Sequence, residues 1–214
     1  MARGLVIFDF DGTLADSFPF FLRVFNQLAD EHGFRRVGPE EIAQLRGWSA
    51  REVMRHVGLP AWRLPLVARD FIHLMRENRG SIPLFEGVAA VVEELRRAGV
   101  QVGVVSSNSR DNVLAVLGDA ARAVRHFECG ASIFGKRPRL KRICRRVGVE
   151  RDAAIYVGDQ ASDLEAARAE GVAFGAVAWG YGDFDALRAL APDETFARVH
   201  DLRRLVGQVR AAAR

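Results

Sequence analysis

The sequence holds only two cysteines, Cys129 and Cys144, and only two lysines, Lys136 and Lys141, against 29 arginines. Two cysteines cannot build a disulfide framework, and a chain of 214 residues does not need one, so a reducing cytoplasm is the expected location. The longest apolar runs, such as residues 172–179, fall far short of the ~20 residues that cross a bilayer. We therefore expect neither a membrane span nor a signal peptide.

The positive charge of the chain is concentrated in one segment. The formal net charge is +4, yet residues 135–151 alone hold eight lysines and arginines and one acid, so the rest of the chain is slightly negative. Such a segment could contact nucleic acid, but we expect an ordinary solvated helix face and no nucleic-acid partner. With 49% apolar and 27% charged residues, the composition is that of a folded protein with one main core.

The hydrophobic pattern changes twice along the chain. Residues 5–8 form a short apolar run typical of a buried strand, and residues 16–82 show helical periodicity throughout. After residue 83, helices are expected over 87–97, 111–117, 139–147 and 162–170, alternating with strands over 100–105, 129–134, 153–157 and 172–178. This alternation is typical of βαβ units around a parallel sheet. The sequence predicts an α/β fold: a three-layer, Rossmann-like core of residues 1–15 and 83–214, with a helical cap of residues 16–82 inserted after the first strand.

Polar side chains follow each expected strand of the core. In open parallel sheets, ligands collect outside the carboxyl ends of the strands. Several carboxylates crowded together repel one another unless a cation compensates them, and oxygen ligands without nearby histidine or cysteine favour Mg²⁺. The sequence therefore predicts a magnesium site at one edge of the sheet, among the residues that follow the strands: Asp9, Asp11, Ser106, Ser107, Asn108, Lys136, Asp159 and Asp163.

Four motifs in order resemble those of the haloacid dehalogenase superfamily, in its phosphatase branch. Residues 8–14, FDFDGTL, look like the first motif, and residues 105–108, VSSN, resemble the second. Lys136, ahead of the arginine-rich helix, resembles the third, and residues 158–163, GDQASD, the fourth. The resemblance covers nearly the whole chain, and its general look is that of phosphoglycolate-phosphatase-like members.

The resemblance implies a role for each catalytic residue. Asp9 is by similarity the nucleophile that forms an aspartyl-phosphate, and Asp11 is the acid that protonates the leaving oxygen and then takes a proton from water. Ser106 and the backbone N–H groups after it would hold the phosphoryl oxygens, and Lys136 would neutralise them. We prefer Lys136 to Lys141 for this role because it directly precedes the expected helix.

The resemblance also implies a metal site. Mg²⁺ would bind Asp159, Asp9 and the backbone carbonyl of Asp11, while Asp163 would orient a metal-bound water. The substrate would be a small phosphate monoester, and we expect the protein to act as a monomer or a homodimer.

The cap would close over the site and present residues that select the substrate. Its best candidate loop is residues 46–49, in which Arg46, or Arg51 just beyond, could pair with a carboxylate or second phosphate of the substrate. Ser107 and Asn108 would contact the substrate from the core. An anionic ester such as 2-phosphoglycolate suits this arrangement, although a plain turn with Trp48 packed inward fits the loop equally well.

Two rival functions remain open from the sequence. A sugar-phosphate mutase resembling β-phosphoglucomutase keeps all four motifs and would use Arg46 to hold a distal phosphate. A non-catalytic protein that binds phosphometabolites or nucleic acid would carry the motifs as remnants. The presence of both Asp9 and Asp11 argues against the second rival, because binding alone requires neither a nucleophile nor an acid.

Overall fold

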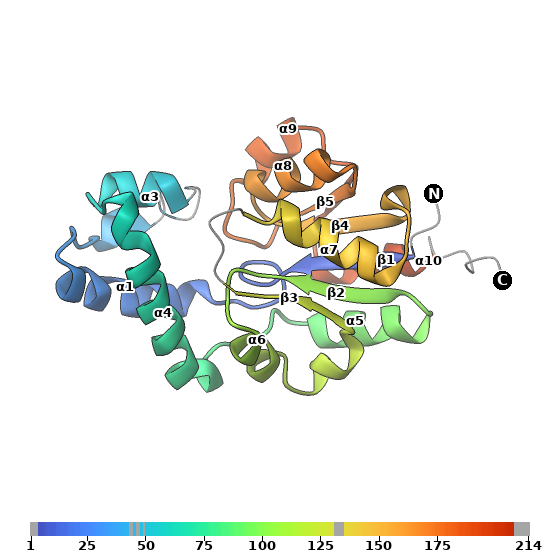
Figure 1. The fold of residues 1–214 in the computed structure, drawn as a ribbon, viewed down its shortest axis with the longest axis horizontal. Helices are drawn as coiled ribbons and strands as arrows, with labels where there is room; N and C mark the ends of the chain where they lie inside the picture. The colour runs from blue at the N-terminus through green and yellow to red at the C-terminus, as the bar shows by residue number, and fades with distance from the viewer. Residues whose placement is uncertain (1–3, 43–44, 46–47, 49, 131–134, 208–214) are drawn as a thin grey trace.

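A computed structural model describes residues 4–42, 45, 48, 50–130 and 135–207. Six strands form one sheet in the order β3-β2-β1-β4-β5-β6, and all neighbouring strands run parallel (Figure 1). This arrangement confirms the predicted α/β class, with the first strand between the second and the fourth. The strands are β1 (Leu5–Asp9), β2 (Gln101–Val105), β3 (His126–Glu128), β4 (Ala154–Gly158), β5 (Ala173–Val177) and β6 (Glu194–Phe196).

Helices cover both faces of the sheet, because successive strand residues point to opposite faces. On β1, Val6 and Phe8 belong to one buried apolar cluster, and Leu5 and Ile7 belong to the other. The first face carries α5 (Val88–Arg97), α6 (Arg110–Leu117) and α10 (Arg204–Gly207). The second face carries α7 (Arg137–Val147), α8 (Ala161–Glu170) and α9 (Phe184–Ala189). The core thus has the three layers expected from the sequence.

Between β1 and α5, the described elements are helices and 3-10 turns joined by loops, as the periodicity predicts. Figure 1 shows these helices beside the core rather than on a face of the sheet. Aromatic rings join the two long ones, with the ring centroids of Phe20 and Phe71 5.6 Å apart. Within this region of helical periodicity, residues 43–44, 46–47 and 49 lie outside the described residues. The described helices are α1 (Phe18–His32), α3 (Ala50–His56) and α4 (Leu64–Asn78), with 3-10 turns at Pro39–Glu41, Ala61–Arg63 and Arg79–Ser81.

The two stretches of chain that join these helices to the sheet run side by side. The Asp16 N–H donates to the Pro83 carbonyl, and the Phe85 N–H donates to the Leu14 carbonyl, each at 2.9 Å. An isolated antiparallel bridge pairs Ala15 with a residue of the returning chain. The helical segment therefore leaves and re-enters the core at one point, directly beyond the end of β1.

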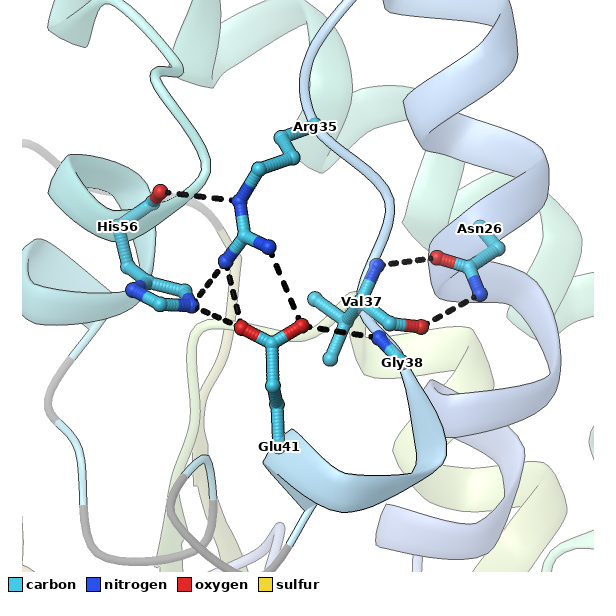
Figure 2. Close-up of polar contacts among 6 residues, drawn as sticks. All are labelled: Asn26, Arg35, Val37, Gly38, Glu41 and His56. Carbon is cyan, nitrogen blue, oxygen red and sulfur yellow. Dashed lines mark hydrogen bonds and ion pairs between the residues drawn. The ribbon is translucent and has the colours of Figure 1, made fainter.

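A polar cluster fixes the loop between α1 and α3 (Figure 2). The Asn26 side chain on α1 brackets Val37, accepting from its N–H at 2.8 Å and donating to its carbonyl at 3.0 Å. The Glu41 carboxylate accepts two bonds from Arg35, at 2.7 and 3.1 Å, and its Oε1 lies 2.6 Å from His56 Nε2. The loop is thus anchored to both α1 and α3.

The third strand differs from the sequence prediction. The apolar run over residues 129–134 suggested a strand there, but β3 ends at Glu128, and residues 131–134 lie outside the described residues. The described third strand lies earlier than predicted, because β3 is a three-residue edge strand whose His126 and Phe127 are only half-buried and which has no long apolar run to mark its bounds. The equally short β6 on the opposite edge escaped prediction for the same reason.

The arginine-rich helix α7 is also less solvated than expected. Arg142 and Arg146 both pair with the buried Glu128, at 2.8 and 2.7 Å, and Arg139 is itself only 4% exposed. Only part of this face meets water, and much of its charge is already compensated by an acid of the same chain. Among the described residues, the helices are too short or too polar for any of them to span a membrane.

Candidate active site

Functional side chains gather where the parallel strands end. Asp9 is the last residue of β1, Ser106 follows β2 directly, and Asp159 follows β4 directly. These three strands are neighbours in the sheet, and the pairing places Asp9 opposite Val105, one residue before Ser106. Parallel pairing brings the carboxyl ends of all three strands to one edge. The edge carries three buried polar side chains at positions where the sheet itself fixes the backbone.

Lys136 reaches this edge from the beginning of α7. Its Nζ lies 2.8 Å from Asp9 Oδ1 and 2.5 Å from Asp163 Oδ1, so one ammonium contacts two carboxylates. Tyr156 on β4 also donates to Asp163 Oδ1, at 3.1 Å. Lys141, by contrast, is exposed on α7. Of the two lysines in the sequence, Lys136 is therefore the one next to the acids.

The acids outnumber the one cation that contacts them. Burial raises the pKa of Asp9, Lys136 lowers it, and the neighbouring carboxylates raise it further. Burial, together with the charge of Asp163, raises the pKa of Asp159 to about 6. Burial alone would lower the pKa of Lys136, but Asp163 and Asp9 outweigh it and raise that pKa. The cluster therefore favours binding of additional positive charge.

A divalent cation fits this cluster. One carboxylate oxygen from each of Asp9, Asp159 and Asp163 lies within 4.8 Å of the others. Asp159 Oδ2 accepts from the N–H groups of Tyr181 and Gly182, whereas the buried Asp159 Oδ1 has no hydrogen-bond partner within the described residues. A buried carboxylate oxygen without a donor is suited to a metal. Both oxygens of Asp163 are engaged, Oδ1 by Lys136 and Tyr156 and Oδ2 by the Gln160 N–H, whereas Lys136 contacts Asp9 at Oδ1. Asp9 and Asp159 therefore offer the freer oxygens.

Asp11 lies two residues beyond Asp9 and outside the three-carboxylate group. Its Oδ1 accepts a hydrogen bond of 2.7 Å from Ser17 Oγ, at the point where the chain leaves the core. Burial raises the pKa of Asp11, and the Ser17 hydrogen bond only partly offsets this effect. Burial thus favours the protonated form of Asp11.

The loop after β2, residues 106–108, is held by its own hydrogen bonds. Ser106 is 1% exposed, and its Oγ accepts from the Asn108 N–H at 3.0 Å. The Asn108 side chain accepts from Ser109 N–H and Asn112 Nδ2 and contacts the sulfur of Met75 on α4. Asn108 thus orders the loop and links it to α4, while Ser107 is exposed.

Sequence reasoning missed the segment that cradles Asp159. Residues 179–182 follow β5, and their backbone N–H groups hold Asp159 Oδ2 at 2.8 and 3.3 Å. Tyr181 also accepts from the Phe18 N–H at 2.7 Å, which ties the cradle to the start of α1. The signal in the sequence that could have revealed the cradle is its glycines. A Cβ at Gly12 would lie 2.5 Å from Asp159, and one at Gly180 would lie 2.2 Å from it; Gly12 also has φ +81°. Both positions need glycine for a close approach.

A small cavity lies between α3, the loop before it and the core. It measures about 140 Å³, and its walls include Trp48, Glu52, Asp159 and Ser162. The Trp48 ring is half-buried and meets the His56 ring edge-on, with centroids 4.6 Å apart. Trp48 therefore connects the polar cluster of Figure 2 with the wall of this cavity.

The two arginines expected to select the substrate lie largely beyond what the structure describes. Arg46 is outside the described residues, as are Gly47 and Ser49 of the same loop. Arg51 lies in the first turn of α3, and its side chain is outside the description. Their role stays a prediction.

Comparison with known proteins places this geometry in a family. A model of the haloacid dehalogenase-like hydrolases matches residues 6–177. A phosphoglycolate phosphatase of Synechococcus elongatus is 35% identical over 208 residues, which cover 95% of this chain and 97% of that protein. Phosphoglycolate phosphatase 1 of Pseudomonas aeruginosa is 26% identical over 92% of this chain and 78% of its own.

Solved structures show the same fold. A haloacid dehalogenase-like hydrolase from Streptococcus pneumoniae superimposes with a TM-score of 0.80 at 17% identity, covering 94% of this chain and 97% of that one. The family match spans the inserted helices and the strand ends that carry Asp9, Ser106 and Asp159, and it ends before residues 179–182 and β6. The chain belongs to the haloacid dehalogenase-like hydrolases.

Proposed function

We propose that this protein is a Mg²⁺-dependent phosphatase that hydrolyses small phosphate monoesters, phosphoglycolate among them, through an aspartyl-phosphate on Asp9. The observation that carries the proposal is the contact between Asp9 and Lys136 at the end of β1. Asp9 contacts Lys136 beside two further carboxylates, and Asp11, two residues on, has its pKa raised by burial. A nucleophile and a proton donor thus stand on one strand end. The 35% identity to a phosphoglycolate phosphatase supports the substrate class.

In the first step, an oxygen of Asp9 attacks phosphorus, and the bond from phosphorus to the ester oxygen breaks. Asp11 gives its proton to that oxygen, so the leaving group departs as an alcohol. A raised pKa keeps Asp11 protonated at a pH where an ordinary aspartate is ionised. Ser17 Oγ holds the Asp11 carboxyl in orientation.

In the second step, ionised Asp11 takes a proton from water, and the water oxygen attacks phosphorus. The bond from phosphorus to Asp9 breaks, which releases phosphate and restores the Asp9 carboxylate and the Asp11 acid. Lys136, the Ser106 hydroxyl and the Ser107 N–H hold the phosphoryl oxygens in both steps.

The metal proposed is Mg²⁺, held by Asp9 and Asp159 with the backbone carbonyl of Asp11, because a small oxygen-ligand site with few carboxylates suits this ion. When bound, it withdraws charge from the phosphoryl group and offsets the repulsion between that group and the acids. Asp163 positions Lys136, which it contacts at 2.5 Å.

We also propose that residues 16–82 act as a cap on a core of residues 1–15 and 83–214. The two connecting stretches of chain, which are hydrogen-bonded to each other at Asp16 and Pro83, provide one hinge region. The contact of Asn108 with Met75 joins cap and core at the loop after β2. A closed cap excludes water and confines the leaving group. Arg46 and Arg51 would then contact an anionic leaving group.

The test is phosphate release from a panel of small phosphate esters, with Mg²⁺ or with a chelator. Wild type is compared with Asp9→Asn, and Asp119→Asn, an exposed acid on the far 3-10 turn Gly118–Ala123, is the matched control. We expect metal-dependent release that Asp9→Asn abolishes and Asp119→Asn retains. Undiminished release by Asp9→Asn would exclude the aspartyl-phosphate route. Isomerisation of a hexose 1-phosphate without phosphate release would identify a mutase instead.

A further inference from the structure

Arg139 is a buried cation that the proposed mechanism does not use. It lies in the first turn of α7 and is 4% exposed, whereas the side chains of Arg142 and Arg146 on the same helix are each 54% exposed. Its guanidinium donates through one nitrogen to the Ser106 carbonyl at 2.6 Å and through the other to the Gly130 carbonyl. The side chain therefore spans from α7 to the backbone of the loop after β2.

These contacts close a ring around the loop of residues 106–108. The Gly130 N–H donates to the Asn108 carbonyl at 2.6 Å, and the Ser106 N–H donates to the Glu128 carbonyl at 3.1 Å. Arg139 thus ties the beginning of the loop to the segment after β3, and Gly130 ties its end to the same segment. The backbone of the loop is fixed at both ends, and the Arg139 side chain supplies one of these links.

In the described part of the chain no carboxylate lies within ion-pair distance of Arg139, and Glu128, whose charge raises the pKa of Arg139, is itself paired with Arg142 and Arg146. Burial lowers its pKa. Burying an unpaired cation is costly, and two backbone carbonyls recover only part of its lost hydration. An apolar side chain would fill the same space at a lower cost. The retention of a cation here points to an anion that the site receives from outside.

The Ser106 carbonyl that Arg139 binds belongs to the same peptide group as the Ser107 N–H. A cation on the oxygen of a peptide group draws electron density from its nitrogen and strengthens the N–H as a donor. Within the described residues, the Ser107 N–H has no acceptor, and Ser107 is exposed at the site edge. It is therefore available to an oxygen of a bound ligand.

We propose that Arg139 is a positioning residue: it fixes the loop of residues 106–108 and strengthens the Ser107 N–H as a donor to the phosphoryl group of the substrate. The inference rests on the proposed phosphatase function, since the phosphoryl dianion is the anion that balances the buried cation. Arg139 touches neither substrate nor metal, and it acts through the peptide group between Ser106 and Ser107.

The test compares Arg139→Met with Arg139→Lys and with Arg142→Met. Arg142 is the matched control because it is an arginine on the same helix whose partner, Glu128, lies outside the loop. Three quantities are measured in the presence of Mg²⁺: the dissociation constant of inorganic phosphate by calorimetry, KM and kcat for the ester that wild type hydrolyses fastest, and the urea midpoint.

We expect Arg139→Met to weaken phosphate binding about tenfold, the size of one lost hydrogen bond to a charged group, and to lower kcat as well. Arg139→Lys restores the cation and should bind phosphate more tightly than Arg139→Met. Arg142→Met should stay within about twofold of wild type in phosphate affinity and kcat, whatever its urea midpoint, because it leaves the loop untouched.

A folded Arg139→Met protein with the phosphate affinity and kcat of wild type would overturn the inference, as would equal losses in Arg142→Met. A purely structural role would lower the urea midpoint and leave the affinity of the folded protein unchanged. Where Arg139→Met does not fold, Arg139→Gln retains an amide donor without charge and carries the same expectation and the same refutation. If wild type itself neither binds phosphate nor hydrolyses any ester, the proposed function fails. That result is distinct from an active wild type whose phosphate affinity and kcat do not change when Arg139 is replaced, which refutes the present inference alone.

Discussion

Removing the charge of Asp159 should stabilise the metal-free protein, although it removes a proposed metal ligand. Asp159 is 1% exposed, and its pKa rises from 3.8 to about 6 in the fold because of burial and the charge of Asp163. The fold therefore favours the protonated form of this carboxyl, and ionising it costs free energy. The cost is absent below pH 3.8, grows as the pH rises to 6, and is constant above that.

The size of the effect follows from the shift of about two pH units. At 1.36 kcal/mol per unit, ionised Asp159 destabilises the metal-free fold by about 3 kcal/mol at pH 7.5. In Asp159→Asn, the side-chain oxygen can still accept from the N–H groups of Tyr181 and Gly182. The amide NH₂ then faces the carboxylates of Asp9 and Asp163, which lie within 4.8 Å. The substitution thus removes the charge and retains the cradle.

Urea unfolding in the presence of a chelator measures this difference. At pH 7.5 we expect Asp159→Asn to be more stable than wild type by up to about 3 kcal/mol, or about 6–12 °C in Tm for a chain of this size. The difference should shrink toward pH 4. Saturating Mg²⁺ should stabilise wild type by about 3 kcal/mol at a hundredfold excess over its Kd and leave the variant unchanged.

The control is Asp119→Asn, which removes an exposed acid and should not alter stability at either pH. Equal or lower stability of Asp159→Asn in the chelator at pH 7.5 would refute the reasoning. A stability gain that is the same at pH 4 and pH 7.5 would refute it too, because the gain would then have another cause than the ionisation of Asp159.

Three other substitutions test neighbouring parts of the molecule. Ser17→Ala removes a hydrogen bond that lowers the pKa of Asp11, so the alkaline limb of the kcat–pH profile should move to higher pH. Gly12→Ala forces a Cβ to within 2.5 Å of Asp159 Oδ2 at φ +81°, so the folded protein should lose Mg²⁺ affinity in calorimetry along with about 1 kcal/mol of stability. Glu41→Gln should lower the stability of the folded protein near neutral pH and not at pH 2: the Arg35 contact brings the pKa of Glu41 from 4.5 to about 2, so the contribution of its charge is complete above about pH 4.5 and is lost toward pH 2 in urea unfolding.

Each of these has a clear contrary result. An unchanged or acid-shifted alkaline limb in Ser17→Ala would mean that Asp11 is not the proton donor, and Ser81→Ala serves as the control because Ser81 contacts only cap residues. Wild-type Mg²⁺ affinity in Gly12→Ala would mean that Asp159 moves without consequence for the metal. A stability difference in Glu41→Gln that persists at pH 2 would assign its effect to packing rather than charge.

The ends of the central strands could be predicted from the sequence because a local pattern marks each of them. A short apolar run followed by Asp9 or Asp159 marks both the strand and the place where its side chains meet, and parallel pairing does the rest. The edge strand β3 lacked such a run, since two half-buried residues and the buried Glu128 are too few to show a hydrophobic period. The cradle around Asp159 was missed because it is made of backbone N–H groups, which nearly every residue has and which therefore leave no mark in the sequence.

Arg139 shows why some site residues resist prediction. On α7 it shares a face with Arg142 and Arg146, and spacing alone assigns all three to solvent. What separates Arg139 is its position one turn after Lys136, where the helix begins beneath the strand ends and the Ser106 carbonyl comes within 2.6 Å. That proximity depends on how α7 packs against β2 and β3, which is a property of tertiary structure that helical periodicity does not contain.

Lys136 and Arg139, at the beginning of α7, make different contacts. Lys136 is a compact ammonium that fits between Asp9 and Asp163, whereas Arg139 uses two nitrogens to reach two separate carbonyls. Because both side chains leave the same end of the helix, a shift of this end moves the contact to Asp9, the proposed nucleophile, and the loop of residues 106–108 together. If the proposed roles hold, substitutions of buried apolar residues on α7, such as Leu140→Ala, should lower kcat although they touch no substrate.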